Sequence, residues 1–341
     1  MSSLTDDELY VAYFDTLRDN LAYYSMLTVL PAGFILNIIT SLIFSRKKFS
    51  TTTMGFYYII IALVNNILAL IVMITYLSPK FGEDFLLVSD LSCVFLTFNV
   101  RLFAQMSSWL NVFITVDRMV SITYPSKYPF LKNKKKLTLL MLMLFFVLVA
   151  LNIPNFFFNV ETESEFNSTT NLTAVTKYCT SDDLVVRVRD TIVLLFRIAL
   201  PIFLMVFMNI YLVYKLFKLR GKFRSKSELK KEYIFAVSIF AMNVLYTLSL
   251  IPSFVAIIFL NLFDYDETSL IGTKRQTIVQ FYFSLAILIS SYSVSFPFFI
   301  NLAFNKIFRS ECVYLVRRFL RSEMSTDGNR TRTPSSTKQH H

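Results

Sequence analysis

The chain has 341 residues, of which 55% are hydrophobic and 17% charged, and its formal net charge at pH 7 is +11. Its long uninterrupted apolar runs exclude an ordinary soluble domain, in which apolar and polar positions alternate around a core. The runs are also too long for the strands of a transmembrane barrel, which have about ten alternating residues. The composition therefore predicts an all-α membrane protein, because helices satisfy their own backbone hydrogen bonds within lipid.

Seven apolar segments are each long enough to cross a bilayer, since a helix rises about 1.5 Å per residue and about 20 residues span the hydrocarbon. Five contain no charged residue, and the third and fifth contain one arginine each, Arg101 and Arg197. The segments are residues 21–45, 49–79, 91–116, 137–160, 191–214, 233–263 and 276–305. We predict a seven-helix bundle in residues 21–303, after a segment of residues 1–20 that lacks a cleavable signal peptide.

The charges of the connecting segments predict the orientation of the bundle. The segments on one side carry 25 Lys/Arg and 6 Asp/Glu, whereas those on the other side, with residues 1–20, carry 7 Lys/Arg and 17 Asp/Glu. Cytoplasmic loops hold the excess of Lys and Arg, so we predict the amino terminus outside and the carboxyl terminus inside. The positive charge then belongs to an inner face that suits anionic lipid and an acidic partner, and no nucleic-acid partner is expected.

The cysteines and two glycosylation motifs agree with this orientation. Cys93 and Cys179 both fall on the predicted outer side, where disulfides persist. We expect them to pair and to hold residues 161–190 over the mouth of the bundle; two free buried thiols are the alternative. The same outer loop carries two Asn-x-Ser/Thr acceptors for N-glycosylation, Asn167 and Asn171.

Short motifs follow the seven spans in a fixed order. They are Gly33 and Asn37, Ile61–Asn65, Asp117-Arg118-Met119, Pro125, Pro201, Ser249–Pro252, Phe296–Ile300 and Asn305–Arg309. With these motifs, and with Cys93 placed 25 residues before Arg118, nearly the whole sequence resembles the rhodopsin-like (class A) G-protein-coupled receptors, most of all their neuropeptide-receptor branch. The sequence departs from that family by lacking the sixth-helix Trp and by keeping only Pro297 of the seventh-helix Asn-Pro-x-x-Tyr.

The resemblance implies a multi-pass plasma-membrane receptor that couples an extracellular ligand to a heterotrimeric G protein, and it implies no enzymatic activity. It also implies a latch, formed by Asp117, Arg118 and Glu232, in which the acids hold the arginine until the receptor is activated. Glu232 lies twenty residues before Pro252, at the cytoplasmic start of the sixth span. A solvated charge cluster at a helix end is the alternative interpretation of these residues.

Arg101 and Arg197 are the charged residues within apolar spans, where an arginine normally faces a cavity or a partner. Gln105 lies one helical turn below Arg101 on the same face. We predict that these three residues form a ligand pocket for an anionic or hydrogen-bond-accepting group, and we expect the ligand to be a peptide. The alternative is snorkelling, in which the long side chains reach the outer headgroups.

Residues 304–321 have apolar residues at helical spacing with basic residues between them, which predicts an amphipathic eighth helix on the inner membrane surface. Cys312 in this helix is a candidate for palmitoylation. The tail of residues 322–341 is rich in Ser and Thr, and we predict that it is disordered and that its hydroxyls are available for phosphorylation and arrestin binding.

Catalytic and metal-binding patterns are lacking in the sequence. Its two His are the last two residues, and no Cys/His spacing fits a metal site, so no cofactor or metal is expected. Two alternative functions stay open. The departures in the sixth and seventh helices allow a decoy receptor that binds ligand without coupling, and the many spans allow a transporter or channel.

Overall fold

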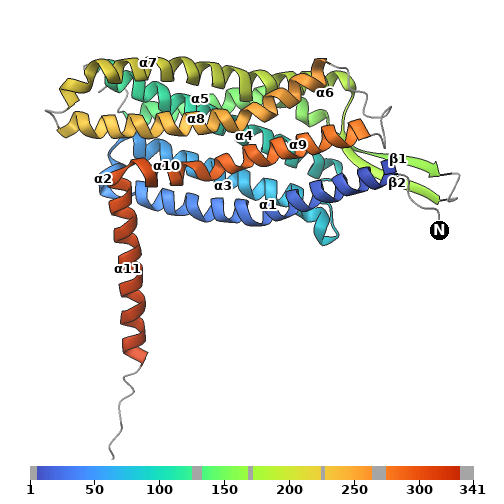
Figure 1. Ribbon diagram of the computed structural model, residues 1–341, viewed down its shortest axis with the longest axis horizontal. Coiled ribbons are helices and arrows are strands. Elements are labelled where there is room, and N and C mark those ends of the chain that lie inside the picture. Colours follow the sequence, from blue (N-terminus) through green and yellow to red (C-terminus); the bar gives the residue numbers. More distant parts are fainter. Residues whose placement is uncertain (1–5, 125–132, 168–171, 224–226, 263–273, 331–341) are drawn as a thin grey trace, which may run out of the picture.

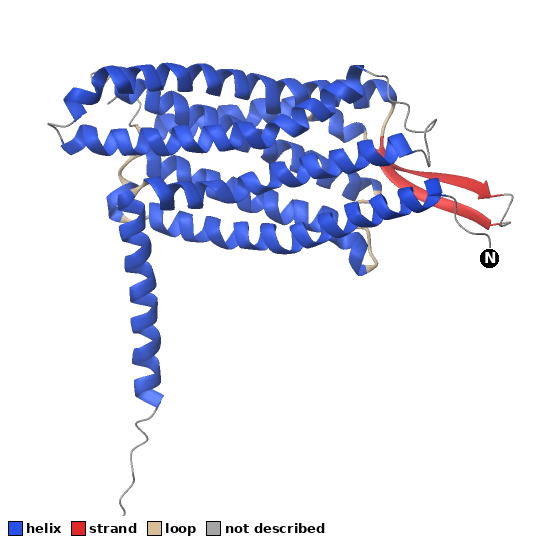
Figure 2. Ribbon diagram, in the orientation of Figure 1, coloured by secondary structure: helices blue, strands red, loops and turns tan. Residues whose placement is uncertain are grey.

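The computed structural model describes residues 6–124, 133–167, 172–223, 227–262 and 274–330 as a bundle of long helices with one β-hairpin (Figures 1 and 2). The helices are α1 (Asp6–Phe44), α2 (Lys47–Ser50), α3 (Thr53–Leu77), α4 (Asp90–Thr123), α5 (Lys134–Leu151), α6 (Asp183–Ile192), α7 (Leu200–Phe223), α8 (Ser227–Leu262), α9 (Lys274–Tyr292), α10 (Phe296–Phe304) and α11 (Lys306–Arg330). Shorter turns are the 3-10 helices η1 (Ser78–Phe81), η3 (Ile153–Phe157) and η5 (Ser293–Ser295) and the π-helix η4 (Val193–Ala199), and the strands are β1 (Asn159–Asn167) and β2 (Leu172–Thr180).

The described helices form the predicted seven-helix bundle. Six rods are long and apolar enough to cross a membrane: α1, α3, α5, the α6–η4–α7 rod, α8, and the α9–η5–α10 rod. The seventh rod is α4, whose buried face is rich in polar groups. This helix contacts α3, α5, α7 and α8, so it needs fewer apolar side chains than its neighbours, which face lipid.

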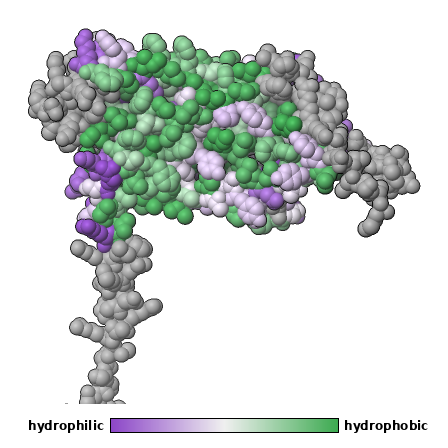
Figure 3. All heavy atoms as spheres, in the orientation of Figure 1, coloured by the Kyte–Doolittle hydropathy of each residue, from purple (hydrophilic) through white to green (hydrophobic). Residues whose placement is uncertain are grey.

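Contacts between neighbouring helices close the bundle into a ring that includes α4. α1 packs on α3 and α9, α8 packs on α7 and α9, and α4 connects α3 to α5 and α7. Gly33 allows α1 to approach η5, because a Cβ at this position would lie 2.7 Å from Ser295 Oγ. On the visible face the hydrophobic surface fills the middle of the bundle, and most of the strongly hydrophilic residues lie at the end where α11 begins (Figure 3).

The first span begins earlier than the sequence predicted. Helix α1 starts at Asp6 rather than at residue 21, because no helix breaker precedes Pro31 and its first turns dock on α9. Phe14 meets the ring of Phe281 edge to face at 5.6 Å, and Arg18 donates a hydrogen bond to Gln280 at 2.8 Å. Residues 6–20 are therefore a helical extension of the first span.

The outer loop after the fourth span is ordered secondary structure, which the sequence analysis did not predict. β1 and β2 pair antiparallel in a hairpin that projects beyond the helix ends (Figure 1). The fifth span also starts earlier than predicted, since α6 begins at Asp183 and continues through η4 into α7. The charged residues of α6 hid this extension, because the predicted span was limited to the apolar run from residue 191.

Helix α11 leaves the inner end of the bundle sideways, across the bundle axis (Figure 1), as a helix on the membrane surface should. It extends to Arg330, past the predicted end at residue 321. Residues 331–341 lie outside the described chain, and the disorder of the tail stays a prediction.

A buried carboxylate anchors α11 to the first cytoplasmic loop. The Glu311 side chain is only 5% exposed, and it pairs with Lys48 Nζ at 2.6 Å and with Arg46 Nε. The Arg46 guanidinium also lies 4.4 Å from the ring centroid of Tyr314. The hydrogen bond from Lys48, assisted by the pairing with Arg46, lowers the pKa of Glu311 below its usual 4.5 despite its burial.

We predict that this anchor is lost when Glu311 is neutralised. A lowered pKa means that the carboxylate stabilises the docked helix above the usual carboxyl pKa of 4.5, and that this stabilisation disappears as the pH falls through the lower pKa of the docked state. A spin label on Cys312, the cysteine outside the disulfide, should gain mobility at low pH, and already at pH 7 in Glu311→Gln. The exposed neighbour change Ser310→Ala is the control; equal mobility in all three proteins contradicts the anchor.

Candidate functional site

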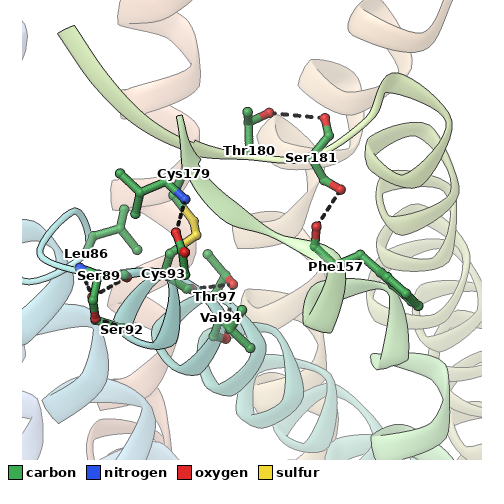
Figure 4. The surroundings of a disulfide bond; sticks show 12 residues. Leu86, Ser89, Ser92, Cys93, Val94, Thr97, Phe157, Cys179, Thr180 and Ser181 are labelled. Carbon is green, nitrogen blue, oxygen red and sulfur yellow. Dashed lines mark hydrogen bonds between the residues drawn. A yellow bond between two sulfur atoms is a disulfide. The ribbon is translucent and has the colours of Figure 1, made fainter. Parts of the chain in front are cut away.

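A disulfide fixes the hairpin at the outer end of the bundle (Figure 4). The predicted pairing of Cys93 with Cys179 is confirmed, with a Cα–Cα distance of 5.7 Å. Two hydrogen bonds support the base of the hairpin: the Val160 amide donates to Asp90 Oδ1 at 2.8 Å, and Ser181 Oγ donates to the carbonyl of Phe157 at 2.7 Å. The hairpin is thus attached to the outer ends of α4 and η3.

One face of the hairpin is acidic. Glu161 and Glu163 alternate along β1, so both lie on one face, and both are exposed. Tyr178 on β2 donates a hydrogen bond to Glu163 Oε2 at 3.0 Å, which raises the pKa of the Tyr178 hydroxyl. Of the predicted glycosylation sites, Asn167 ends β1, and Asn171 lies outside the described residues.

The arginines of the outer half gather from three elements. The charge of Arg101 on α4 interacts with those of Arg197 on η4 and of Arg189 and Asp190 on α6. Asp190 is already paired, since its Oδ1 accepts a hydrogen bond from Arg189 Nε at 2.8 Å. The Arg189 guanidinium also lies 4.4 Å from the ring centroid of Phe158. Asp190 therefore acts favourably on the charge of Arg101 while it is paired with Arg189, and the charges of Arg189 and Arg197 oppose that of Arg101.

Gln105 makes its described hydrogen bond away from these arginines, and its place in the pocket of Arg101 stays a prediction. Its side chain is fully buried against the end of α5, where its Oε1 accepts a hydrogen bond from Asn152 Nδ2 at 2.6 Å. The two positions are one turn apart on α4, and the hydrogen bond with Asn152 places the Gln105 side chain at the contact between α4 and the end of α5.

Trp109 has a role that the sequence analysis missed. In the π-helix η4 the carbonyl of Phe196 would accept from the amide five residues later, but that residue is Pro201, which has no N–H. Trp109 Nε1 donates to this carbonyl at 2.8 Å and so takes the place of the missing amide. The interaction joins α4 to the fifth span next to Arg197. The proline was the sequence signal for an unpaired carbonyl, although not for its partner.

At the inner end of α4 the Asp117-Arg118 pair is buried. Arg118 is 1% exposed, and its guanidinium pairs with Asp117 Oδ2 and donates to Thr53 Oγ1 at 2.8 Å. Thr53 Oγ1 also donates to Asp117 Oδ2 at 3.0 Å, so the first turn of α3 takes part in the pair. Glu232 falls within α8, but its side chain lies outside the described residues, and its place in the latch stays a prediction.

Between the outer arginines and the inner Asp117-Arg118 pair, a series of hydrogen bonds joins neighbouring helices. The carbonyl of Val294 accepts from Asn37 at 3.2 Å and from Asn65 at 3.5 Å, and Ser107 Oγ donates to Asn65 Oδ1 at 2.9 Å. Asn111 Nδ2 in turn donates to the carbonyl of Ser107 at 2.9 Å. Within the described residues, no group of three His, Cys, Asp or Glu side chains could hold a metal ion.

A seven-helix bundle with a disulfide-anchored outer hairpin and a buried Asp-Arg pair at its inner end defines a seven-transmembrane receptor. A comparison with known families matches residues 36–299, most of the chain, to the 7 transmembrane receptor (rhodopsin family). The chain belongs to this family, and it is a multi-pass protein of the plasma membrane. A sequence search of curated proteins gives no match.

We predict that Trp109→Phe destabilises the bundle by about 1–3 kcal/mol, because the Phe196 carbonyl loses its donor within a membrane span, where no water replaces it, while an aromatic ring is kept. Thermal unfolding of the purified protein in detergent measures the loss. In a Pro201→Ala background residue 201 regains its N–H, so the same substitution should cost much less. An equal loss in both backgrounds contradicts the assignment of Trp109 as the substitute donor.

Proposed function

We propose that the chain is a G-protein-coupled receptor that transmits the binding of an extracellular peptide to a heterotrimeric G protein. The observation that carries this proposal is the buried Arg118, held by Asp117 and Thr53 at the inner end of α4. An arginine is expensive to bury unless it is paired and has a use. Here its partners lie on α3 and α4, so a rearrangement of helices at this end could expose it to a partner protein.

The charges at the outer end support a peptide as the ligand. The exposed Glu161 and Glu163 of the hairpin attract a basic segment, whereas the deeper Arg101 and Arg197 favour a carboxylate or a carbonyl. A peptide can carry both kinds of group a few residues apart, and the neuropeptide-receptor branch that the sequence resembles is consistent with such a ligand. For Arg101, snorkelling to the headgroups is less favoured, because the charge of Asp190 on α6 acts favourably on its guanidinium.

Other features of the proposed receptor follow from its orientation. Residues 6–44 start outside and enter the membrane as one helix, and Asn167 at the end of β1 lies on the same side, where it would carry a glycan. Asn171, the second predicted acceptor, lies outside the described residues. Cys312 on α11 is half-buried at the inner surface, a suitable place for a palmitoyl chain beside the bilayer. The phosphorylated tail would bind arrestin.

A decoy receptor that binds ligand without coupling is the second candidate. It is favoured by the replacement of the sixth-helix Trp in Ser249–Pro252 and by Phe296 and Ile300 in the seventh helix. The family consists of receptors, which argues against the transporter or channel alternative.

The latch leads to a first prediction for this function. Glu232→Ala should raise ligand-independent nucleotide exchange on the G protein, because Arg118 loses a partner from another helix. Arg118→Ala should instead abolish exchange while it spares ligand binding. Exchange on purified G protein, measured with the receptor in lipid nanodiscs, decides between these outcomes; a decoy receptor would give no exchange in the unchanged protein either.

The arginines lead to a second prediction. Arg101→Ala should weaken the binding of a peptide ligand, selected from a library on the unchanged receptor, by about 2 kcal/mol, as expected for one charge-assisted hydrogen bond. Surface expression should stay normal. Arg187→Ala, which removes an exposed arginine from α6, is the matched control and should leave the affinity unchanged. An unchanged affinity in a normally expressed Arg101→Ala protein favours snorkelling.

A further inference from the structure

A buried amide joins three helices in the inner half of the bundle. Asn243 on α8 donates from its Nδ2 to Thr115 Oγ1 on α4 at 2.6 Å and to Asn209 Oδ1 on α7 at 3.2 Å. Thr115 Oγ1 in turn donates a hydrogen bond to the carbonyl of Asn111 at 2.7 Å. We call the three side chains of Asn243, Thr115 and Asn209 the amide bridge.

The amide bridge is shielded from water. Asn243 and Thr115 are fully buried and Asn209 is 6% exposed, and apolar side chains of the same helices surround them. In such an interior a hydrogen bond is stronger than at a surface, and its loss leaves polar atoms without solvent to replace the partner. Asn243 Oδ1 has no partner among the described residues, so the amide is held through its Nδ2 group.

The position of the amide bridge connects it to the inner end of the receptor. Thr115 lies one helical turn before Arg118 on α4, and Asn243 lies nine residues before Pro252, which interrupts the hydrogen bonding of α8. The segment of α8 on the inner side of this proline can therefore swing as a unit. A swing of this segment away from α4 breaks the bond of Asn243 to Thr115, and a swing that also leaves α7 breaks its bond to Asn209.

We propose that Asn243 is a positioning residue that restrains the inner half of α8 against α4 and α7, and that this restraint keeps the ligand-free receptor inactive. The second part rests on the proposed function, since it requires a G protein that reads the position of α8. The restraint itself does not depend on the proposed function. A helix segment held by a few hydrogen bonds can exist in a held and a released state, and a ligand that binds one state more tightly shifts the equilibrium between them.

The restraint is tested with two variants and one control. Asn243→Leu and Thr115→Val replace polar side chains by apolar ones of similar size. Ser238→Ala removes a buried hydroxyl of the same helix whose hydrogen bond goes to the carbonyl of Ile234, within α8, at 3.0 Å. Hydrogen–deuterium exchange of residues 234–248 measures the restraint on the purified receptor in nanodiscs, without ligand or G protein.

Thr115→Val should speed the amide exchange of this segment by about five-fold, the change that follows from the loss of one buried hydrogen bond, and Asn243→Leu, which loses two, by at least as much, whereas Ser238→Ala should not. The double variant should add little to Asn243→Leu, because both changes remove the same bond. Exchange that stays at the unchanged rate in both folded variants, or effects that add fully in the double variant, would falsify the restraint.

Basal nucleotide exchange on a purified G protein is measured on the same samples. A rise of similar size in Asn243→Leu and Thr115→Val supports the link between the restraint and inactivity. Faster amide exchange without any nucleotide exchange, even in Glu232→Ala, overturns the link and the proposed coupling together, and leaves the restraint established. Absence of both changes, in receptors that otherwise couple, overturns the role of Asn243 alone.

Discussion

Polar atoms within a lipid-embedded bundle have no water to bind. Each must form its hydrogen bonds with another helix or with the backbone of its own helix, and this constraint organises the interior of the receptor. A series of hydrogen bonds that starts at the carbonyl of Val294 satisfies this constraint through short amide and hydroxyl side chains. These hydrogen bonds join α1, α3, η5, α4, α8 and α7. The residues of the series are Val294, Asn37, Asn65, Ser107, Asn111, Thr115, Asn243 and Asn209. Asparagine suits this purpose because it provides both donors and an acceptor without a charge.

Helix α4 is the element on which both ends of the receptor depend. At its outer end Cys93 holds the hairpin, and at its inner end Arg118 lies with Asp117. Between them Trp109 provides the donor that the fifth span lacks at Pro201. A helix with so many partners cannot be uniformly apolar, which explains why it has the weakest membrane-spanning composition of the seven rods. Rearrangement at either end must therefore pass through contacts that α4 makes.

The distribution of charge separates the two faces of the receptor. The outer end combines an acidic hairpin with arginines deeper in the bundle, whereas the inner end combines basic loops with carboxylates that are buried and paired. Glu311 and Asp117 both follow the second pattern, one at the membrane surface and one within the bundle. Because a buried carboxylate is costly without a cation, these two acids fix the local arrangement of α11 and α4 more strictly than exposed ion pairs would.

The sequence by itself determined the number of spans, their orientation and the disulfide, because hydrophobic length, the side on which Lys and Arg gather and the compartment of a cysteine are properties of single segments. It also located Arg101, since a charge within an apolar run stands out without knowledge of its neighbours, and Arg118, through the Asp-Arg motif that follows the third span. It could not assign partners. The contact of Gln105 with Asn152, the role of Thr53 beside Arg118 and the hydrogen bonds of Asn243 all join residues distant in sequence. Which face of each helix meets which neighbour depends on helix rotation and packing, and only the tertiary structure decided it.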